Sequence, residues 1–117
     1  MSTYLINNLR IPGGVPNEQA LQYLEQVEAT VAPFGGVWLA QGDVTPIEGA
    51  WPGAAVLMEF PDRTHAEAWY ASPEYQAILP LRVNNAISDA IFIDSLPEGF
   101  TVKAFAGEVR RMIAAAA

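Results

Sequence analysis

The run AAVLMEF at residues 54–60, followed by PDRTHAEAWYASPEY at residues 61–75, passes from a strand pattern to a helix pattern at a single proline. Residues 54–60 are apolar except for Glu59, which is typical of a strand with both faces covered. Pro61 ends that strand, and Asp62 is a good N-cap for a helix. The run therefore predicts a strand followed directly by a helix.

The second half of the same run predicts a pair of short helices. Ser72 and Pro73 are an N-cap and a first-turn proline, so they end one helix and begin another. Pro80 is expected to bend the second of these helices, because proline cannot donate a backbone hydrogen bond inside a helix. Residues 87–94 then read as a further strand.

The N-terminal side of the run contains two strands and one helix. Residues 3–11 and residues 36–42 have strand patterns, with Gly and Pro at their ends. Asn17 is a good N-cap for the helix between them, which is expected to end before Pro33. The apolar residues at helical spacing, taken as its buried face, are Leu21, Leu24, Val27 and Val31.

The order of these elements is strand, helix, strand, strand, helix pair, strand. This order matches the α+β ferredoxin-like βαββαβ arrangement, with a four-stranded antiparallel sheet and both helical segments on one face. The other face is also apolar, because alternation places Leu57 and Ile91 there. A homodimer with facing sheets is the simplest cover for it.

Residues 1–95 are predicted to form this domain, and residues 96–117 a C-terminal extension with a short helix. The helix has an apolar stripe at helical spacing, made of Phe105, Val109, Met112 and Ile113. The four closing alanines are expected to fray. We interpret the extension as an accessory arm that crosses to the partner subunit.

Composition excludes several classes of function. The chain has 117 residues and a formal charge of −7, which disfavours nucleic acids and acidic membranes as partners. Its longest apolar run is far shorter than the roughly 20 residues that span a bilayer. The absence of Cys and the single His predict no metal site, and no cofactor motif is present. No secretory signal is recognisable, so a cytoplasmic location is expected.

Three charged residues are candidates for catalysis. Arg82 is suited to hold a carboxylate or enolate, or else it forms an ion pair with Glu48 or Glu59. Glu48 lies in a loop between strands, where it is either functional or bonded to backbone amides. Glu59, in an apolar strand, would become a general base if its carboxylate were half-buried and unpaired.

The remaining candidates are an imidazole and several aromatic rings. His65 is the only His, and it is either a proton carrier or a solvated residue in the first turn of its helix. Tyr75, Trp38 and Trp69 are candidates to bind a substrate, with the core as their alternative place. Tyr75 is the strongest of these, because the cap at Ser72 would fix the direction of its hydroxyl.

Several motifs resemble the domain-of-unknown-function 1330 family. They are Ile47-Glu48-Gly49, Glu59-Phe60-Pro61, Ala68-Trp69-Tyr70, Ser72-Pro73-Glu74-Tyr75-Gln76 and Leu81-Arg82. The resemblance covers about four fifths of the chain, from Tyr4 to Asp94. It implies membership of the dimeric α/β-barrel superfamily, and hence a ferredoxin-like homodimer. That superfamily includes cofactor-independent monooxygenases, isomerase-like enzymes, dehydratases and proteins of no known activity.

Two functional hypotheses follow. The first is a homodimeric barrel acting as a cofactor-independent enzyme, monooxygenase-like or isomerase-like, on a small organic molecule. Glu48, Glu59, Tyr75 and Arg82 would then surround one pocket between the sheet and the helices. The second hypothesis is a non-catalytic dimer that binds a small ligand or is structural, in which these polar residues form only ion pairs.

Overall fold

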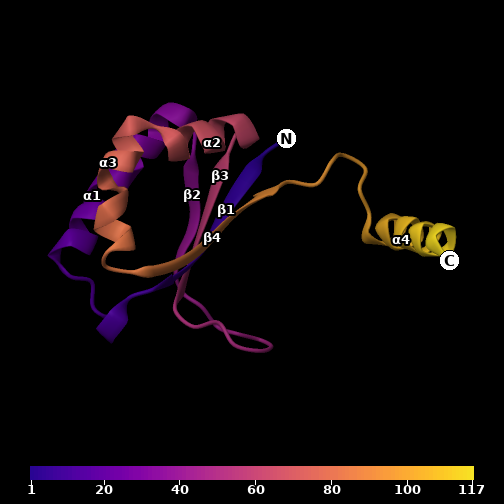
Figure 1. The fold of residues 1–117 in the computed structure, drawn as a ribbon, viewed down its shortest axis with the longest axis horizontal. Coiled ribbons are helices and arrows are strands. Elements are labelled where there is room, and N and C mark those ends of the chain that lie inside the picture. The colour runs from indigo at the N-terminus through magenta and orange to yellow at the C-terminus, as the bar shows by residue number, and fades with distance from the viewer.

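The computed structural model describes residues Met1–Ala117, in which a four-stranded sheet has three α-helices on one side and a fourth on the other (Figure 1). The main elements are β1 (Thr3–Arg10), α1 (Glu18–Val31), β2 (Val37–Asp43), β3 (Ala54–Phe60), α2 (Arg63–Ala71), α3 (Pro73–Val83), β4 (Ile87–Asp94) and α4 (Val102–Ala116). Short 3-10 turns occur at Pro12–Gly14 and Ala32–Phe34. The strand order is β2-β3-β1-β4, and every neighbouring pair is antiparallel. The predicted ferredoxin-like α+β fold is confirmed.

The predicted N-caps begin the helices as expected. Asn17 Oδ1 accepts from the backbone N–H of Ala20 at 3.0 Å, and Asp62 Oδ1 accepts from that of His65 at 2.8 Å. Ser72 Oγ accepts from the backbone N–H of Tyr75 at 3.3 Å. Each cap satisfies a helix N–H that has no partner inside its own helix.

Three strand boundaries, in β1 and β2, differ from the prediction by one residue. β1 ends at Arg10 rather than at residue 11, and β2 covers Val37–Asp43 rather than residues 36–42. β2 also contains a register shift between Trp38 and Ala40, which is a β-bulge. The strands β3 and β4 have the predicted bounds.

The core lies between the sheet and the helices α1, α2 and α3. Val56, Met58 and Phe60 of β3 point to this side and are buried. They pack with a cluster from the other strands and helices, made of Leu5, Val27, Val31, Ala66, Trp69, Tyr75 and Ile78. The alternation of side chains along β3 thus decides which of its residues enter the core.

The opposite face of the sheet, here named the open face, is covered by no helix of the body. Ile91 in β4 pairs with Ile6 in β1, which pairs in turn with Leu57 in β3, so all three lie on this face. Ile91 is 56% exposed. Other apolar residues about half exposed on this face are Val37, Ile87 and Ile93. An apolar row of this kind is unusual on the surface of a monomer.

The helix α4 stands away from the rest of the molecule, on the side of the open face (Figure 1). None of its residues is buried. The radius of gyration is 17.6 Å, against about 13 Å for a compact domain of this length. α4 continues through three of the four closing alanines to Ala116, which fits the high helix propensity of alanine. Fraying of this end stays a prediction.

None of the helices has the length and hydropathy needed to cross a membrane.

Candidate functional site

Two tyrosines and an arginine meet between α1 and α3. The hydroxyl groups of Tyr23 and Tyr75 are 2.8 Å apart and share a hydrogen bond. Arg82 Nη2 donates to the Tyr75 hydroxyl at 3.4 Å, and its guanidinium lies 5.7 Å from the centre of the Tyr23 ring. We refer to Tyr23, Tyr75 and Arg82 as the tyrosine–arginine cluster.

Helix geometry explains why these side chains meet. Tyr75 lies in the first turn of α3, fixed by the Ser72 cap, and Arg82 lies in the last turn. A separation of seven residues is close to two helical turns, so both side chains lie on one face of α3. Tyr23 lies in the middle of α1, which packs beside α3.

Arg82 differs from the other arginines of the sheet-and-helix body in having no carboxylate partner. Arg10 binds Asp89 at 2.6 Å and Arg63 binds Asp94 at 3.1 Å, whereas Arg82 forms no ion pair. Arg82 therefore does not form the ion pair with Glu48 or Glu59 that was the alternative expectation from the sequence. A partly buried guanidinium without an anion leaves strong hydrogen-bond donors for a ligand.

The electrostatics of the cluster keep the Tyr23 phenol neutral and the Arg82 guanidinium charged. Burial, reinforced by the neighbouring Tyr75, raises the pKa of Tyr23 well above its usual range. Burial opposes the charge of Arg82, but attraction to Tyr75 and Tyr23 outweighs it and raises the pKa of Arg82. The cluster thus offers a fixed positive charge beside the neutral hydroxyl group of Tyr23.

A small cavity of about 30 Å³ adjoins the cluster and is lined by Tyr23 and Arg82. Its other lining residues are Leu9, Ile11, Pro16, Ala20, Leu24 and Ala86. An open hollow of about 390 Å³ shares Ile11 and Ala86 with it. The hollow carries the amide side chains of Asn17, Asn84 and Asn85. The two spaces are therefore neighbours, of which the hollow is the more polar and the small cavity is apolar apart from Arg82.

Asn7 in β1 supplies a further polar group on the helix-facing side. It is 7% exposed, and its Nδ2 donates to Ser88 Oγ at 3.4 Å. Its Oδ1 is buried and accepts no hydrogen bond. Asn7 lies between Leu9, which lines the small cavity, and Leu5, which lines a separate apolar hollow of about 190 Å³. A buried acceptor without a donor is costly, and a bound molecule is one way to satisfy it.

The carboxylates predicted to share this pocket lie elsewhere. Glu48 borders a hollow of about 300 Å³ in the loop between β2 and β3, and Glu59 borders another of about 260 Å³ beside Pro61. Glu59 pairs with Tyr4 and so points to the open face, away from α3. The expectation that Glu48, Glu59, Tyr75 and Arg82 surround one pocket was therefore wrong for the single chain. Only Tyr75 and Arg82 are brought together.

The other predicted residues have structural contacts. His65 is exposed, and its Nδ1 lies 2.7 Å from Asp62 Oδ1. Trp69 is 2% exposed, and its Nε1 donates to Thr30 Oγ1 at 3.1 Å within the core. Trp38 lies in β2, at the edge of the sheet opposite β4, and its Nε1 donates to Gln41 Oε1 at 3.0 Å.

Sequence reasoning missed Tyr23 because it placed the buried face of α1 correctly at Val27 and Val31 but wrongly at Leu21 and Leu24. Leu21 and Leu24 were expected to be buried, but they are 41% and 42% exposed. The buried residues of α1 are Ala20, Val27, Thr30 and Val31. Tyr23 lies at helical spacing between Ala20 and Val27, and this spacing is the signal that could have found it. The structure contains no group of three acidic or imidazole side chains arranged to hold a metal.

The fold and the sheet order define the class of protein, which is the ferredoxin-like α+β class. Comparison with solved structures supports this assignment. A protein of unknown function from Rhodopseudomonas palustris is 18% identical, with a TM-score of 0.61, covering 82% of this chain and 83% of the other. A dimeric ferredoxin-like protein of unknown function from Thermobifida fusca is 17% identical, with a TM-score of 0.59, covering 81% and 92%.

SnoaB, a cofactor-independent oxygenase from Streptomyces nogalater, has the same fold, with 8% identity and a TM-score of 0.56, covering 86% of this chain and 97% of the other. No curated protein matches the chain. Residues 2–96 match the family described as Domain of unknown function (DUF1330), and the chain belongs to this family.

Proposed function

We propose that the protein is a homodimer that binds a small organic anion at the tyrosine–arginine cluster. The observation that carries the proposal is that Arg82 is partly buried and borders a cavity, yet has no carboxylate partner. A guanidinium in that position recognises a planar anion such as a carboxylate or an enolate through paired hydrogen bonds. The apolar lining of the cavity favours a ligand whose remaining part is a hydrocarbon or an aromatic ring.

The ligand is expected to enter through the asparagine-lined hollow. Asn17 Nδ2 donates to Asn85 Oδ1 at 2.6 Å, and Asn85 Nδ2 donates to Gln19 Oε1 at 2.9 Å. These amide contacts join the start of α1 to the end of α3 across the hollow. The inner cavity is of the size of one water molecule, so the start of α1 and the end of α3 must separate when a larger ligand binds.

The homodimer forms through the open face of the sheet. Its half-exposed row of Ile87, Ile91 and Ile93 is the kind of surface that a second sheet would cover. The dimeric state named for the Thermobifida fusca protein supports the same arrangement here. A cytoplasmic location stays a prediction of the sequence.

A cofactor-independent oxidation or isomerisation is the second candidate function. Two phenol groups next to a guanidinium are suited to stabilise a negative oxygen on a substrate. The fold shared with the oxygenase SnoaB supports this candidate. Because Glu48, Glu59 and His65 do not line the cavity, the substrate itself would have to ionise readily. Their predicted catalytic roles stay untested predictions.

The experiment that tests anion binding is a calorimetric titration with benzoate, and with benzamide as the neutral probe of equal shape. We expect benzoate to bind and benzamide to bind at least about 10-fold more weakly, since only benzoate pairs with the guanidinium. Arg82→Gln should remove this preference. Arg63→Gln is the matched control, because Arg63 already pairs with Asp94 on the surface.

Equal binding of the two probes, or a benzoate preference that survives in Arg82→Gln, would contradict the proposal. Native mass spectrometry of the purified protein would then identify any small molecule that it carries. A neutral molecule bound there would also overturn the assignment of an anion site.

A further inference from the structure

The helix α4 is a separate structural feature that the ligand site does not explain. Its apolar residues lie on one side, at helical spacing: Val102, Phe105, Val109, Met112 and Ile113. Phe105, Met112 and Ile113 are 52%, 69% and 64% exposed, so most of this stripe is open. Within the chain, Phe105 lies beside Phe100 of the preceding loop, with ring centroids 6.2 Å apart. An isolated helix of 15 residues is marginal in water, and tertiary packing normally stabilises such a helix.

The charge of α4 is opposite to that of the body. Lys103, Arg110 and Arg111 against Glu108 give the helix a formal charge of +2. Residues 1–96 hold three arginines and eleven acidic side chains, a formal charge of −8. A basic amphipathic helix on an acidic protein is attracted to a second acidic body of the same kind.

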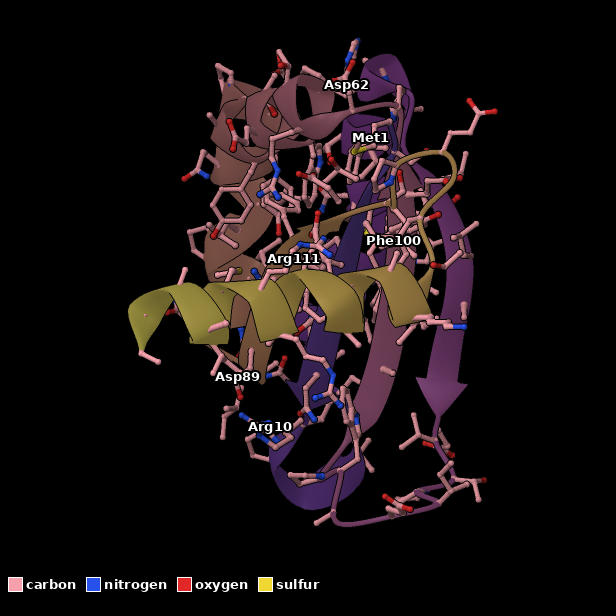
Figure 2. All side chains as sticks on the ribbon, turned by 90° about the vertical axis from the view of Figure 1, so that its right-hand side faces the viewer. Met1, Arg10, Asp62, Asp89, Phe100 and Arg111 are labelled. Carbon is pink, nitrogen blue, oxygen red and sulfur yellow. The ribbon has the colours of Figure 1, made fainter.

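The position of α4 points to the partner subunit. Figure 1 shows α1, α2 and α3 on one side of the sheet and α4 on the other, beyond the open face. Seen from that side in Figure 2, α4 crosses in front of the strands. In the proposed dimer the partner sheet occupies this side, about 10 Å from the first sheet. Residues 95–101 span at most about 25 Å, which is enough to pass a packed sheet.

We propose that α4 packs its apolar stripe on the body of a second copy of this chain, so that the two subunits exchange their C-terminal helices. This inference rests on the proposed homodimer and adds a surface outside the sheet. Two helices of opposite subunits would then hold each dimer together, in an isologous arrangement. The acidic body supplies the electrostatic attraction, and the stripe supplies the apolar contact.

The first test is photo-crosslinking from a single engineered cysteine, which the cysteine-free chain makes specific. Met112→Cys places a benzophenone label on the stripe, and Ala114→Cys places it in the same turn on the other side of the helix. We expect covalent dimers from Met112→Cys at least about 5-fold above those from Ala114→Cys. Crosslinks confined to one chain would show that α4 folds back on its own body, and equal yields from the two positions would overturn the proposal.

The second test measures the dimer dissociation constant by light scattering over a dilution series. Phe105→Asp and Ala104→Asp add the same charge to the first turn of α4, but only Phe105 lies on the stripe. We expect Phe105→Asp to raise the dissociation constant at least about 10-fold and Ala104→Asp to change it less than about 2-fold. An unchanged dimer in both variants overturns the exchange but leaves the sheet-face dimer intact. A monomeric wild-type protein overturns both.

A lipid surface is the alternative partner for the apolar stripe of α4. Sedimentation with vesicles of phosphatidylcholine and phosphatidylglycerol at 3:1 distinguishes it. We expect no binding, because the acidic body opposes a negative surface. Vesicle binding by the wild type that Phe105→Asp abolishes would assign the stripe to a membrane instead.

Discussion

Tyr75 in α3 and Tyr23 in α1 are joined by a hydroxyl-to-hydroxyl hydrogen bond of 2.8 Å. Their rings form a T-shaped contact, with centroids 6.2 Å apart. Tyr75 is 1% exposed and also contacts Trp69, whose ring centroid is 4.2 Å away. This single pair therefore connects the candidate site to the core. Changes at Tyr75 should affect folding, and changes at Tyr23 should affect mainly the site.

A double-mutant cycle tests this coupling. We expect Tyr75→Phe to destabilise the fold by about 1–2 kcal/mol, because it removes the hydrogen bond that the partly buried Tyr23 hydroxyl shares with Tyr75. Tyr23→Phe alone should cost less, since Tyr75 keeps the contact with Arg82. Urea unfolding of both variants and of the double variant gives the interaction energy, expected near 1 kcal/mol. Strict additivity would contradict a stabilising bond between the hydroxyls.

Acid should weaken the fold through Asp94. The hydrogen bond from Thr3 Oγ1, at 2.7 Å, and the nearby Arg63 lower the pKa of Asp94 below its model-compound value of 3.8. A lowered folded-state pKa gives stability that is present above 3.8 and is lost as the pH falls through the folded-state pKa. Urea midpoints between about pH 2 and pH 6 measure this loss.

Asp94→Asn should shrink the loss of stability between pH 4 and pH 2, since the titrating carboxylate is gone. Asp43→Asn is the matched control, because Asp43 is exposed and forms no ion pair. A pH profile unchanged by Asp94→Asn would show that other carboxylates govern acid unfolding.

Gly36 occupies a place where the chain tolerates no side chain. A Cβ added there would lie 2.7 Å from Phe60 Cε1 and would also overlap Val31 Cγ1. Both neighbours are fully buried, so they have little room to move. Gly36→Ala should therefore destabilise the protein by about 1–3 kcal/mol in chemical denaturation.

Gly107 in α4 offers a control for Gly36→Ala. An added Cβ there would meet only Arg111 Nη1, at an ordinary contact distance of 3.7 Å. Gly107→Ala should leave the unfolding midpoint of the body unchanged or slightly higher. If the two substitutions had equal effects, overlap with Phe60 would not be the cause.

A charge on the open face should separate the subunits. Ile91→Glu places a carboxylate in the middle of the apolar row, where a facing sheet would have to bury it. We expect the dimer dissociation constant to rise at least about 10-fold in sedimentation equilibrium, with circular dichroism unchanged. Leu21→Glu, at a partly exposed position of α1, adds the same charge away from this face. Equal dimerisation of the two variants would place the interface elsewhere.

The fold could be predicted from local chemistry, because caps and turns act over a few residues. Asn17, Asp62 and Ser72 fixed the helix starts, and alternation along residues 54–60 fixed which residues of β3 face the helices. The same alternation shows why the predicted pocket failed. Glu59 is two residues from Leu57, so both side chains lie on the face of β3 opposite Met58. Arg82, on α3, lies on the Met58 side of the sheet.

The candidate site depended on packing between helices, which local patterns do not encode. Leucine is more apolar than alanine or threonine, so Leu21 and Leu24 gave the stronger signal for a buried face. The observed face places Ala20 and Thr30 inward, because small residues allow α1 to approach its neighbours and Thr30 accepts from Trp69. The helical spacing that links Tyr23 to Ala20 and Val27 was therefore a weaker signal than the two leucines.

The β-bulge between Trp38 and Ala40 has a consequence for how far the protein can assemble. β2 is an outer strand of the sheet, and a bulge there interrupts the regular row of N–H and C=O groups that an added strand would need. The other outer strand, β4, carries Asp89, where Arg10 and Asp89 lie together at one end of the strand (Figure 2). Both edge strands therefore resist the addition of further strands that would build a fibril. Association through the open face alone then stops at a dimer.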